Sequence, residues 1–211
     1  YRSDHGDDET IDLMAEAGCE GAFLGCESGS DKMLKLMNKT ARRKDYMRAI
    51  PRLRDVGIIT HANLIVGFPG EDGETIAETR SLLEEARPDF FRAQLWYADP
   101  ITPIWEKRSE LKIVGSMFNW EHQSMSAEQA SDIVDQLFLD VRGSIWLPQS
   151  GFELWSVFYL MRRGMPLDRV KDYVRAFNAA VRENVGQPGP VEISAAALER
   201  LCAATSFGRR E

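Results

Sequence analysis

The chain has 211 residues, which is enough for one large domain or for one domain with an appendage. A hydrophobic content of 44% and a charged content of 28% are typical of a soluble globular protein, and the apolar runs are too short to span a bilayer. The net charge of −7 argues against a nucleic-acid-binding face, because phosphate binding usually needs a basic patch. We therefore expect a cytoplasmic protein with neither a membrane nor a nucleic-acid partner.

The start of the chain is polar and lacks an initiating Met, which predicts a fragment or an excised domain rather than a signal peptide. Cys19, Cys26 and Cys202 fit a reducing compartment better than a disulfide framework. Their spacing is neither that of a zinc site nor that of an iron–sulfur site. We expect the cysteines to be small buried hydrophobes.

The first hundred residues alternate between helical and strand patterns. Apolar spacing predicts helices over residues 9–17, 31–37, 43–56 and 74–86, and short apolar runs predict strands over residues 21–25, 58–66 and 90–97. Gly18 and Gly57 are expected to end helices, and Asp72 to cap one. Residues 2–5 are expected to end a further strand. Strands that alternate with helices predict a parallel sheet with right-handed crossovers.

The second half of the chain is expected to be helical only. Residues 126–129 have the form of a capping box, and helical patterns follow at residues 130–141, 151–161, 167–183 and 193–203. We therefore divide the chain into a βα part, residues 1–105, and a helical part, residues 106–211. The aromatic residues that recur at helical spacing are expected to pack in the core rather than to border a substrate: Trp146, Phe152, Trp155, Phe158 and Tyr159.

Two glycine-centred turns, residues 25–30 and 67–71, each follow a predicted strand and precede a predicted helix. Such a turn brings bare backbone close to a ligand and directs helix N–H groups at it. Two of these units in series predict a βα-barrel whose ligand lies at the carboxyl ends of the strands.

The first turn carries the carboxylate of Glu27, which can accept hydrogen bonds from a ribose diol or an ammonium group. Ser28 and Ser30 can donate to a ligand, but Glu27 and Ser30 can equally cap the following helix. The second turn lets a flat ring approach the backbone, as in adenine recognition. Its alternative is an ordinary βα turn with Glu71 or Asp72 at the helix N-terminus.

No catalytic residue and no metal ligand is assigned within this chain. His5, His61 and His122 are not at ligand spacing to another His or Cys, which argues against a zinc site. The sequence contains neither a nucleophile elbow nor a phosphate-binding Walker loop. The aromatic residues of the βα part are expected in the core and the barrel mouth: Phe90, Phe91, Trp96, Tyr97 and Trp105.

Taken together, residues 16–31, 37–39 and 57–71 resemble the motifs of radical S-adenosylmethionine (radical SAM) enzymes, in the same order. Tyr97, Pro100, Thr102 and Pro103 resemble the segment that closes the barrel of these enzymes. The resemblance covers about residues 1–125 and implies the C-terminal part of a (βα)6-type barrel followed by a helical substrate-side region. Residues 120–125 further resemble an element of cobalamin-dependent methyltransferases that act on natural products or peptides, in which a cobalamin domain precedes the barrel.

Residue by residue, the resemblance implies S-adenosylmethionine as a ligand. It places Glu27 and Ser28 beside the ribose and amino-acid part of that cofactor, with Gly25 in the same strand. It places the adenine along Val66, Gly67 and Phe68.

One departure concerns the [4Fe-4S] cluster, which the family binds with a C-x3-C-x2-C run. This sequence has no such run, and Cys19, Cys26 and Cys202 cannot replace it. The resemblance therefore implies that the cluster ligands and the cobalamin domain lie outside this chain, in an upstream part of the parent protein.

The resemblance implies that the parent cleaves S-adenosylmethionine to a 5′-deoxyadenosyl radical and uses cobalamin to methylate a small-molecule or peptide substrate. Its electron donor would be a flavodoxin or ferredoxin. This chain alone is expected to be inactive and to bind no cluster. Because its sheet edges are open, it is expected to associate or aggregate, or to be held by parts outside the given sequence. The rival enzymes are a cobalamin-dependent cyclase or oxidase and a methylthiotransferase. A non-catalytic partner- or peptide-binding scaffold is the rival of another class, and a complete-barrel hydrolase or isomerase would need more βα units.

Overall fold

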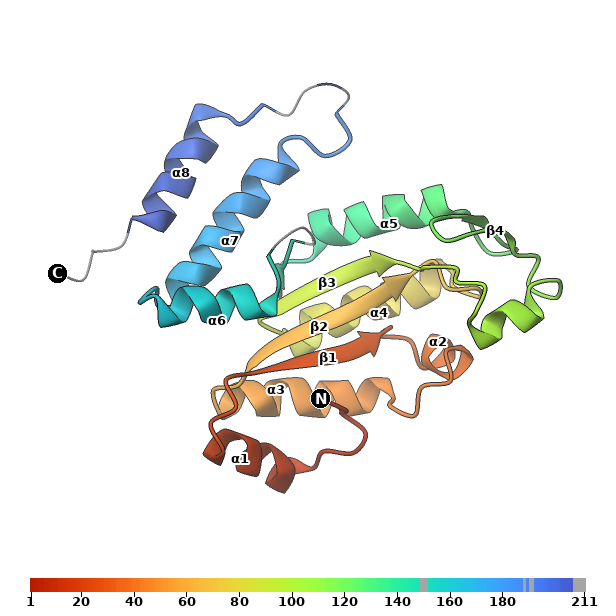
Figure 1. The fold of residues 1–211 in the computed structure, drawn as a ribbon, viewed down its shortest axis with the longest axis horizontal. Helices are drawn as coiled ribbons and strands as arrows, with labels where there is room; N and C mark the ends of the chain where they lie inside the picture. Colours follow the sequence, from red (N-terminus) through yellow and green to blue (C-terminus); the bar gives the residue numbers. More distant parts are fainter. Residues whose placement is uncertain (149–151, 188, 190–191, 207–211) are drawn as a thin grey trace. The chain divides into compact units, whose positions relative to one another are not determined.

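The computed structural model describes residues 1–148, 152–187, 189 and 192–206, and the chain forms two compact units, Tyr1–Ser144 and Ile145–Glu211 (Figure 1). The first unit contains α1 (Asp8–Glu16), β1 (Gly21–Glu27), α2 (Asp31–Leu36), α3 (Arg43–Asp55), β2 (Ile59–Val66), α4 (Gly73–Ala86), β3 (Phe90–Leu95), the 3-10 helix η1 (Pro103–Lys107), β4 (Val114–Ser116), β5 (Asn119–Glu121) and α5 (Ala127–Asp140). The second contains β6 (Ile145–Trp146), α6 (Leu154–Arg162), α7 (Leu167–Arg182) and α8 (Ala195–Thr205).

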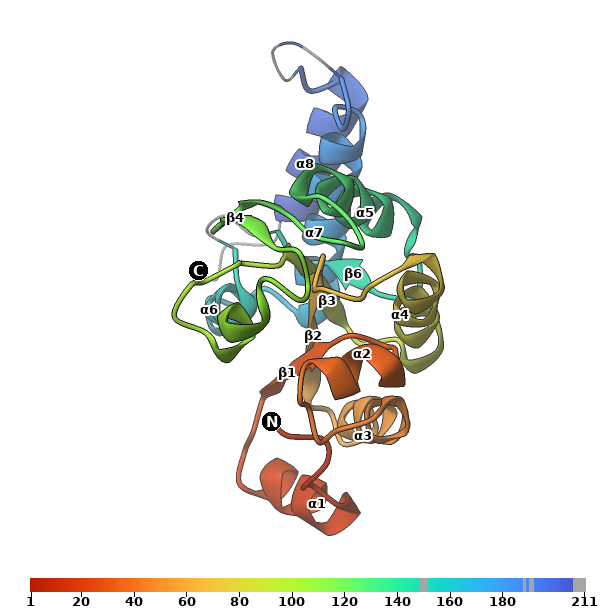
Figure 2. The ribbon, with the colours of Figure 1, turned by 90° about the vertical axis from the view of Figure 1, so that its right-hand side faces the viewer.

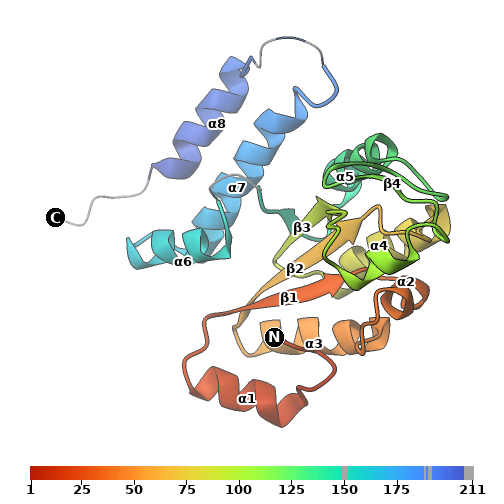
Figure 3. The same ribbon diagram turned by 45° about the vertical axis from the view of Figure 1, so that its right-hand side comes forward.

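The centre of the first unit is a parallel sheet in which β2 pairs with β1 on one side and with β3 on the other (Figure 3). His61 of β2 is the register partner of Phe23 on β1 and of Phe90 on β3. Because helices connect successive strands, the strands run in one direction and their carboxyl ends meet at one edge. The predicted α/β class with a parallel sheet is confirmed.

The two faces of this sheet differ in chemistry because side chains alternate along each strand. One face is apolar and buried, and it includes Leu24, Leu64 and Val66. Figure 2 shows α2, α3 and α4 together on one side of the sheet. The other face carries Phe23, His61, Asn63, Arg92 and Gln94, and the Gln94 side-chain amide donates to Asn63 Oδ1 at 2.9 Å.

Local signals explain where most helices begin and end. Asp72 caps α4 by accepting a hydrogen bond from the Thr75 N–H at 3.0 Å, and Ser126 caps α5. Gly18 follows α1 with φ +81°, and Gly57 follows α3 with φ +83°, a conformation that glycine adopts without a steric penalty. The predicted caps and helix ends at these positions are confirmed.

Two predictions about secondary structure are wrong. Residues 2–5 form a turn rather than a strand end, because the Arg2 carbonyl accepts from the His5 and Gly6 N–H groups. The second half is not helical only, because β4 and β5 pair as an antiparallel hairpin and β6 follows α5. Each of these strands has two or three residues, too few for alternation to be recognised in a sequence.

In the second unit, α7 packs against both α6 and α8. The prediction that the aromatic residues of this region lie in the core is wrong for Trp155 and Tyr159, whose exposed fractions are 62% and 50%. Their spacing of four residues places them on one face of α6, but that face is turned to solvent and the Arg163 guanidinium lies over the Tyr159 ring at 4.9 Å. Gly151 of the predicted helix lies outside the described residues.

The division into residues 1–105 and 106–211 stays a prediction about function. The boundary between the two compact units lies further along the chain, after Ser144. Among the residues that the structure describes, none of the helices is long and apolar enough to cross a membrane.

Candidate cofactor site

The carboxyl ends of β1 and β2 both finish in backbone conformations that are rare for residues with side chains. Glu27 closes β1 with φ +61°, after a shift in the register between Gly25 and Glu27. Gly67 follows β2 with φ +93°. A non-glycine residue at positive φ is strained, and such strain clusters at functional sites. The two predicted turns therefore lie side by side at one edge of the sheet.

The Glu27 carboxylate folds back over its own strand toward Lys39. Lys39 Nζ lies 3.2 Å from Glu27 Oε1, and about a fifth of the Glu27 side chain is exposed, 21%. A Cβ atom at Gly25 would lie only 2.7 Å from the same oxygen, so the absence of a side chain at Gly25 makes room for this carboxylate. An acidic and a basic group thus share one end of β1.

Ser28 faces the protein interior. Its hydroxyl lies 3.1 Å from the Thr79 hydroxyl of α4 and accepts from the Ser30 N–H at 3.1 Å, and the residue is fully buried. The side chain therefore ties the turn to α4. Ser30 occupies the N-cap position of α2 without a side-chain cap hydrogen bond, so the alternative in which Ser30 caps the helix is wrong.

The second turn is held at Gly67 from two directions. The Gly67 N–H donates to Glu71 Oε2 at 2.6 Å, and the Gly67 carbonyl oxygen lies 2.8 Å from His122 Nε2. Val66 is fully buried, whereas Phe68 is half-buried and meets Trp96 edge-on with ring centroids 5.7 Å apart. Of the three residues predicted along an adenine, Phe68 is thus the one with an accessible side chain.

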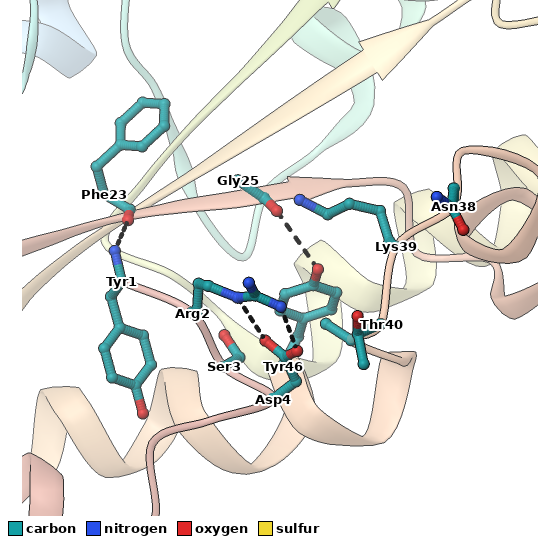
Figure 4. A pocket seen from close by; sticks show the side chains of 11 residues that line it. Tyr1, Arg2, Ser3, Asp4, Phe23, Gly25, Asn38, Lys39, Thr40 and Tyr46 are labelled. Carbon is teal, nitrogen blue, oxygen red and sulfur yellow. Dashed lines mark hydrogen bonds and ion pairs between the residues drawn. The ribbon is translucent and has the colours of Figure 1, made fainter. Parts of the chain in front are cut away.

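Two cavities meet the ends of these strands. A cavity of about 700 Å³ is lined by Phe68 and Trp96, by Asn38 and by residues of the η1 region. A second, of about 430 Å³, is lined by Gly25, Lys39 and again Asn38. Figure 4 shows Lys39 and the Gly25 carbonyl at this second cavity, with the Tyr46 hydroxyl 3.4 Å from that carbonyl oxygen. Asn38 lines both cavities, one beside the aromatic residues Phe68 and Trp96 and the other beside Lys39.

The electrostatics of the site follow from burial. Loss of solvent raises the pKa of Glu71 to about 7, although the Gly67 N–H partly opposes this change. Burial lowers the pKa of His122, so its imidazole is neutral at pH 7. Burial also raises the pKa of the Cys26 thiol well above its ordinary range, so this cysteine packs as an apolar group.

Sequence reasoning missed the roles of Glu71, His122 and Lys39. The sequence suggests Glu71 only as a residue at a helix N-terminus, but Asp72 makes that cap while Glu71 turns back to Gly67. The spacing of four residues from Gly67 is a signal that points to this contact. Although residues 120–125 resemble a family element, no local signal predicts that His122 contacts Gly67, because the two residues are 55 positions apart.

A metal site is not formed by the parts of the chain that the structure describes, where no group of three His, Cys, Asp or Glu side chains is close enough to hold an ion. Cys26 is buried and Cys202 is exposed. These residues do not fit an iron–sulfur cluster, which needs three converging thiolates.

Fold and site together define a βα protein with two cavities at the carboxyl ends of parallel strands, where ligands bind in such folds. Residues 1–83, which include both turns, match the model of the Radical SAM superfamily. Over this segment the chain is similar to the radical SAM superfamily.

Individual relatives are similar over parts of the chain. A tRNA-2-methylthio-N(6)-dimethylallyladenosine synthase of Orientia tsutsugamushi (strain Ikeda) is 39% identical over 94 residues, which are 41% of this chain and 21% of that protein. An anaerobic magnesium-protoporphyrin IX monomethyl ester cyclase of Rubrivivax gelatinosus is 30% identical over 101 residues, or 48% of this chain and 18% of that protein. The chain thus spans about a fifth of the length of these curated relatives.

Among solved structures, the archaeal Elp3 of Methanocaldococcus infernus, solved with an N-terminal deletion, superposes with a TM-score of 0.55 at 19% sequence identity. The match covers 69% of this chain and 33% of that one. At this identity the likeness concerns the fold alone.

Proposed function

We propose that this chain forms the part of a radical SAM enzyme that holds the adenosyl and amino-acid groups of S-adenosylmethionine. The observation that carries this proposal is the pair of cavities that Asn38 lines, one beside Phe68 and the other beside Lys39. The family match over both turns supports it. A long, flat-ended and zwitterionic ligand matches an aromatic wall at one end and an ion pair at the other.

The adenine falls on Phe68 and Trp96 rather than on the Gly67 amide. The Gly67 N–H is already bound to Glu71 and is not free for a ring nitrogen. Phe68 and Trp96 line the larger cavity and offer apolar surface for a flat ring. Val66 and Gly67 then act through the backbone, by fixing where Phe68 lies.

Glu27 and Lys39 bind the polar end of the ligand. The Glu27 carboxylate accepts hydrogen bonds from ribose hydroxyls or from the ammonium group, and Lys39 pairs with the ligand carboxylate. The 3.2 Å pair between them keeps both charges compensated before the ligand arrives. Ser28 contributes indirectly, by tying this turn to α4.

S-adenosylmethionine, when bound beside a reduced [4Fe-4S] cluster, supplies a 5′-deoxyadenosyl radical in the family that this chain resembles. The residues described here fit the S-adenosylmethionine part of that chemistry but not the cluster, and this chain's task is to orient the cofactor and to keep water from it. Cluster ligands and an electron donor belong to the proposal for the parent protein.

For the parent reaction, we favour cobalamin-dependent methylation, which rests on the resemblance of residues 120–125. Methylthio transfer to tRNA is the second candidate, because the Orientia synthase of that name is 39% identical over its matched region. Cyclisation, the reaction in the name of the Rubrivivax relative, is supported in the same way at 30% identity. Turnover of the parent protein with isotopically labelled S-adenosylmethionine separates them, because the product gains a methyl group, a methylthio group or a ring.

Calorimetric titration of the 211-residue chain with S-adenosylmethionine tests the binding proposal. We expect saturable binding that weakens about tenfold in Glu27→Gln, since a hydrogen bond to a charged group contributes roughly 1.5–3 kcal/mol. Glu9→Gln on the exposed face of α1 is the matched control and should bind like the wild type. Equal affinity in the two variants would contradict the role of Glu27.

A further inference from the structure

The segment of residues 120–125, which contains the end of β5 and leads to α5, contacts the Gly67–Gly70 turn at three points. His122 Nε2 lies 2.8 Å from the Gly67 carbonyl oxygen, and the Ser124 hydroxyl accepts from the Gly70 N–H at 2.8 Å. A Cβ at Gly67 would lie 2.5 Å from the Trp120 ring, so the indole covers this glycine. We infer that residues 120–125, called the bracing segment below, position the cofactor-binding turn, with His122 and Ser124 as positioning residues; this inference rests on the proposed function.

The hydrogen bonds of His122 assign its tautomer. A carbonyl oxygen can only accept, so Nε2 carries the proton that it donates to Gly67. Nδ1 is then the acceptor that faces the N–H groups of Ser124 at 3.3 Å and Met125 at 3.4 Å. One neutral imidazole therefore links the turn to the loop that carries Ser124.

The bracing segment is itself held in place by its neighbours. The Trp120 indole N–H donates to the Trp96 carbonyl at 2.9 Å, and the Trp120 ring stacks on His122 with an interplanar angle of 4°. The His122 backbone N–H donates to the Met125 carbonyl at 3.1 Å. These contacts hold the bracing segment in one conformation beside the Gly67–Gly70 turn.

The turn needs such support. Gly67 and Gly70 adopt φ +93° and +97°, and glycine loses more backbone freedom on ordering than any other residue. Phe68 and Pro69 lie between the two contact points and line the larger cavity. Holding both ends of this short loop fixes the aromatic wall before the ligand arrives, which lowers the cost of binding.

Hydrogen exchange and calorimetry on the full 211-residue chain test the inference with Ser124→Ala, His122→Leu and His122→Gln. Ser124→Ala removes the acceptor of the Gly70 N–H, so exchange at Gly70 should accelerate about tenfold and S-adenosylmethionine affinity should fall about fivefold. His122→Leu should act alike at the turn, whereas His122→Gln retains a donor and should recover most of the affinity. Ser131→Ala, at an exposed position of α5 outside the bracing segment, is the matched control.

The outcomes separate the two proposals. Unchanged Gly70 exchange and unchanged affinity in Ser124→Ala, or equal affinity in His122→Leu and His122→Gln, would overturn the inference. Absence of S-adenosylmethionine binding by the wild-type chain would overturn the proposed function instead, and the exchange rates would still report whether the turn is braced. Thermal unfolding of each variant identifies a loss of fold, and Ser124→Ala, which removes a single hydroxyl, keeps the test decisive if His122→Leu unfolds.

Discussion

Two buried ionisable side chains, Glu71 in the second turn and His61 in β2, have pKa values that move in opposite directions. Burial raises the pKa of Glu71 to about 7 and lowers the pKa of His61 to about 4. Among the described residues, neither ring nitrogen of His61 has a hydrogen-bond partner, and the ring meets Phe23 edge-on at 5.2 Å. The fold therefore favours the neutral form of each side chain, and each side chain makes the free energy of unfolding depend on pH.

Glu71→Gln tests the first of these groups. The native pKa of Glu71 lies above its ordinary value of 4.5, so the native state binds the extra proton. The stability that protonated Glu71 gives the fold is therefore lost as the pH rises from 4.5 to 7. The amide keeps an oxygen for the Gly67 N–H but does not ionise. We expect the variant to match the wild type at pH 4 and to be more stable at pH 8, by up to about 3 kcal/mol. Denaturant unfolding at both pH values measures this, and a difference independent of pH would refute it.

His61→Leu tests the second group, with the opposite sign. The native pKa lies below the ordinary value of 6.5, so stability is lost as the pH falls from 6.5 to 4. We expect His61→Leu to stabilise the chain by about 1 kcal/mol at pH 8, because an unpartnered buried polar group is removed, and by more at pH 5. His5→Leu, at an exposed position, is the control. A smaller gain at pH 5 than at pH 8 would contradict this assignment.

At the scale of elements, the sequence predicts what local signals determine. Apolar spacing, glycine ends and the caps at Asp72 and Ser126 define the helices and strands around the parallel sheet, and the glycine turns identify the edge where Glu27 and Phe68 lie. The β4–β5 hairpin and the contact of His122 with Gly67 escape prediction, because short strands lack alternation and the contact joins residues 55 positions apart. Ser28 shows that a turn motif does not tell which side chains face inward.

Gly67→Ala and Gly18→Ala form a matched pair that separates backbone strain from steric clash. Both glycines have positive φ, but a Cβ at Gly67 meets Trp120 at 2.5 Å whereas a Cβ at Gly18 has no atom within 4 Å. We expect Gly18→Ala to cost about 1 kcal/mol and Gly67→Ala at least about 2 kcal/mol more. Chemical unfolding of both variants provides the comparison, and equal costs would show that the Trp120 contact yields without strain.

At the scale of the whole molecule, the sheet of the first unit carries an exposed aromatic side chain on its polar face. Phe23 of β1 is 48% exposed on the face that carries polar side chains, and the chain spans about a fifth of its curated relatives. An exposed aromatic residue beside a sheet edge favours contact with another apolar surface.

We therefore expect the chain to self-associate with increasing concentration. Phe23→Asp should reduce this association, because a charge on the exposed face opposes burial, and Phe118→Asp on the exposed β4–β5 turn is the control. Light scattering after size-exclusion chromatography measures the mass. A monomer at high concentration in the wild type would contradict the expectation.

The most direct measurement of the cofactor site is an NMR titration of the isotopically labelled chain with S-adenosylmethionine. If the ligand lies along the two strand ends, the amide resonances of Gly25, Lys39 and Phe68 shift together and saturate with one dissociation constant, while those of α8 stay unchanged. Shifts confined to other parts of the chain, or no shifts at saturating ligand, would contradict a cofactor site at this edge of the sheet.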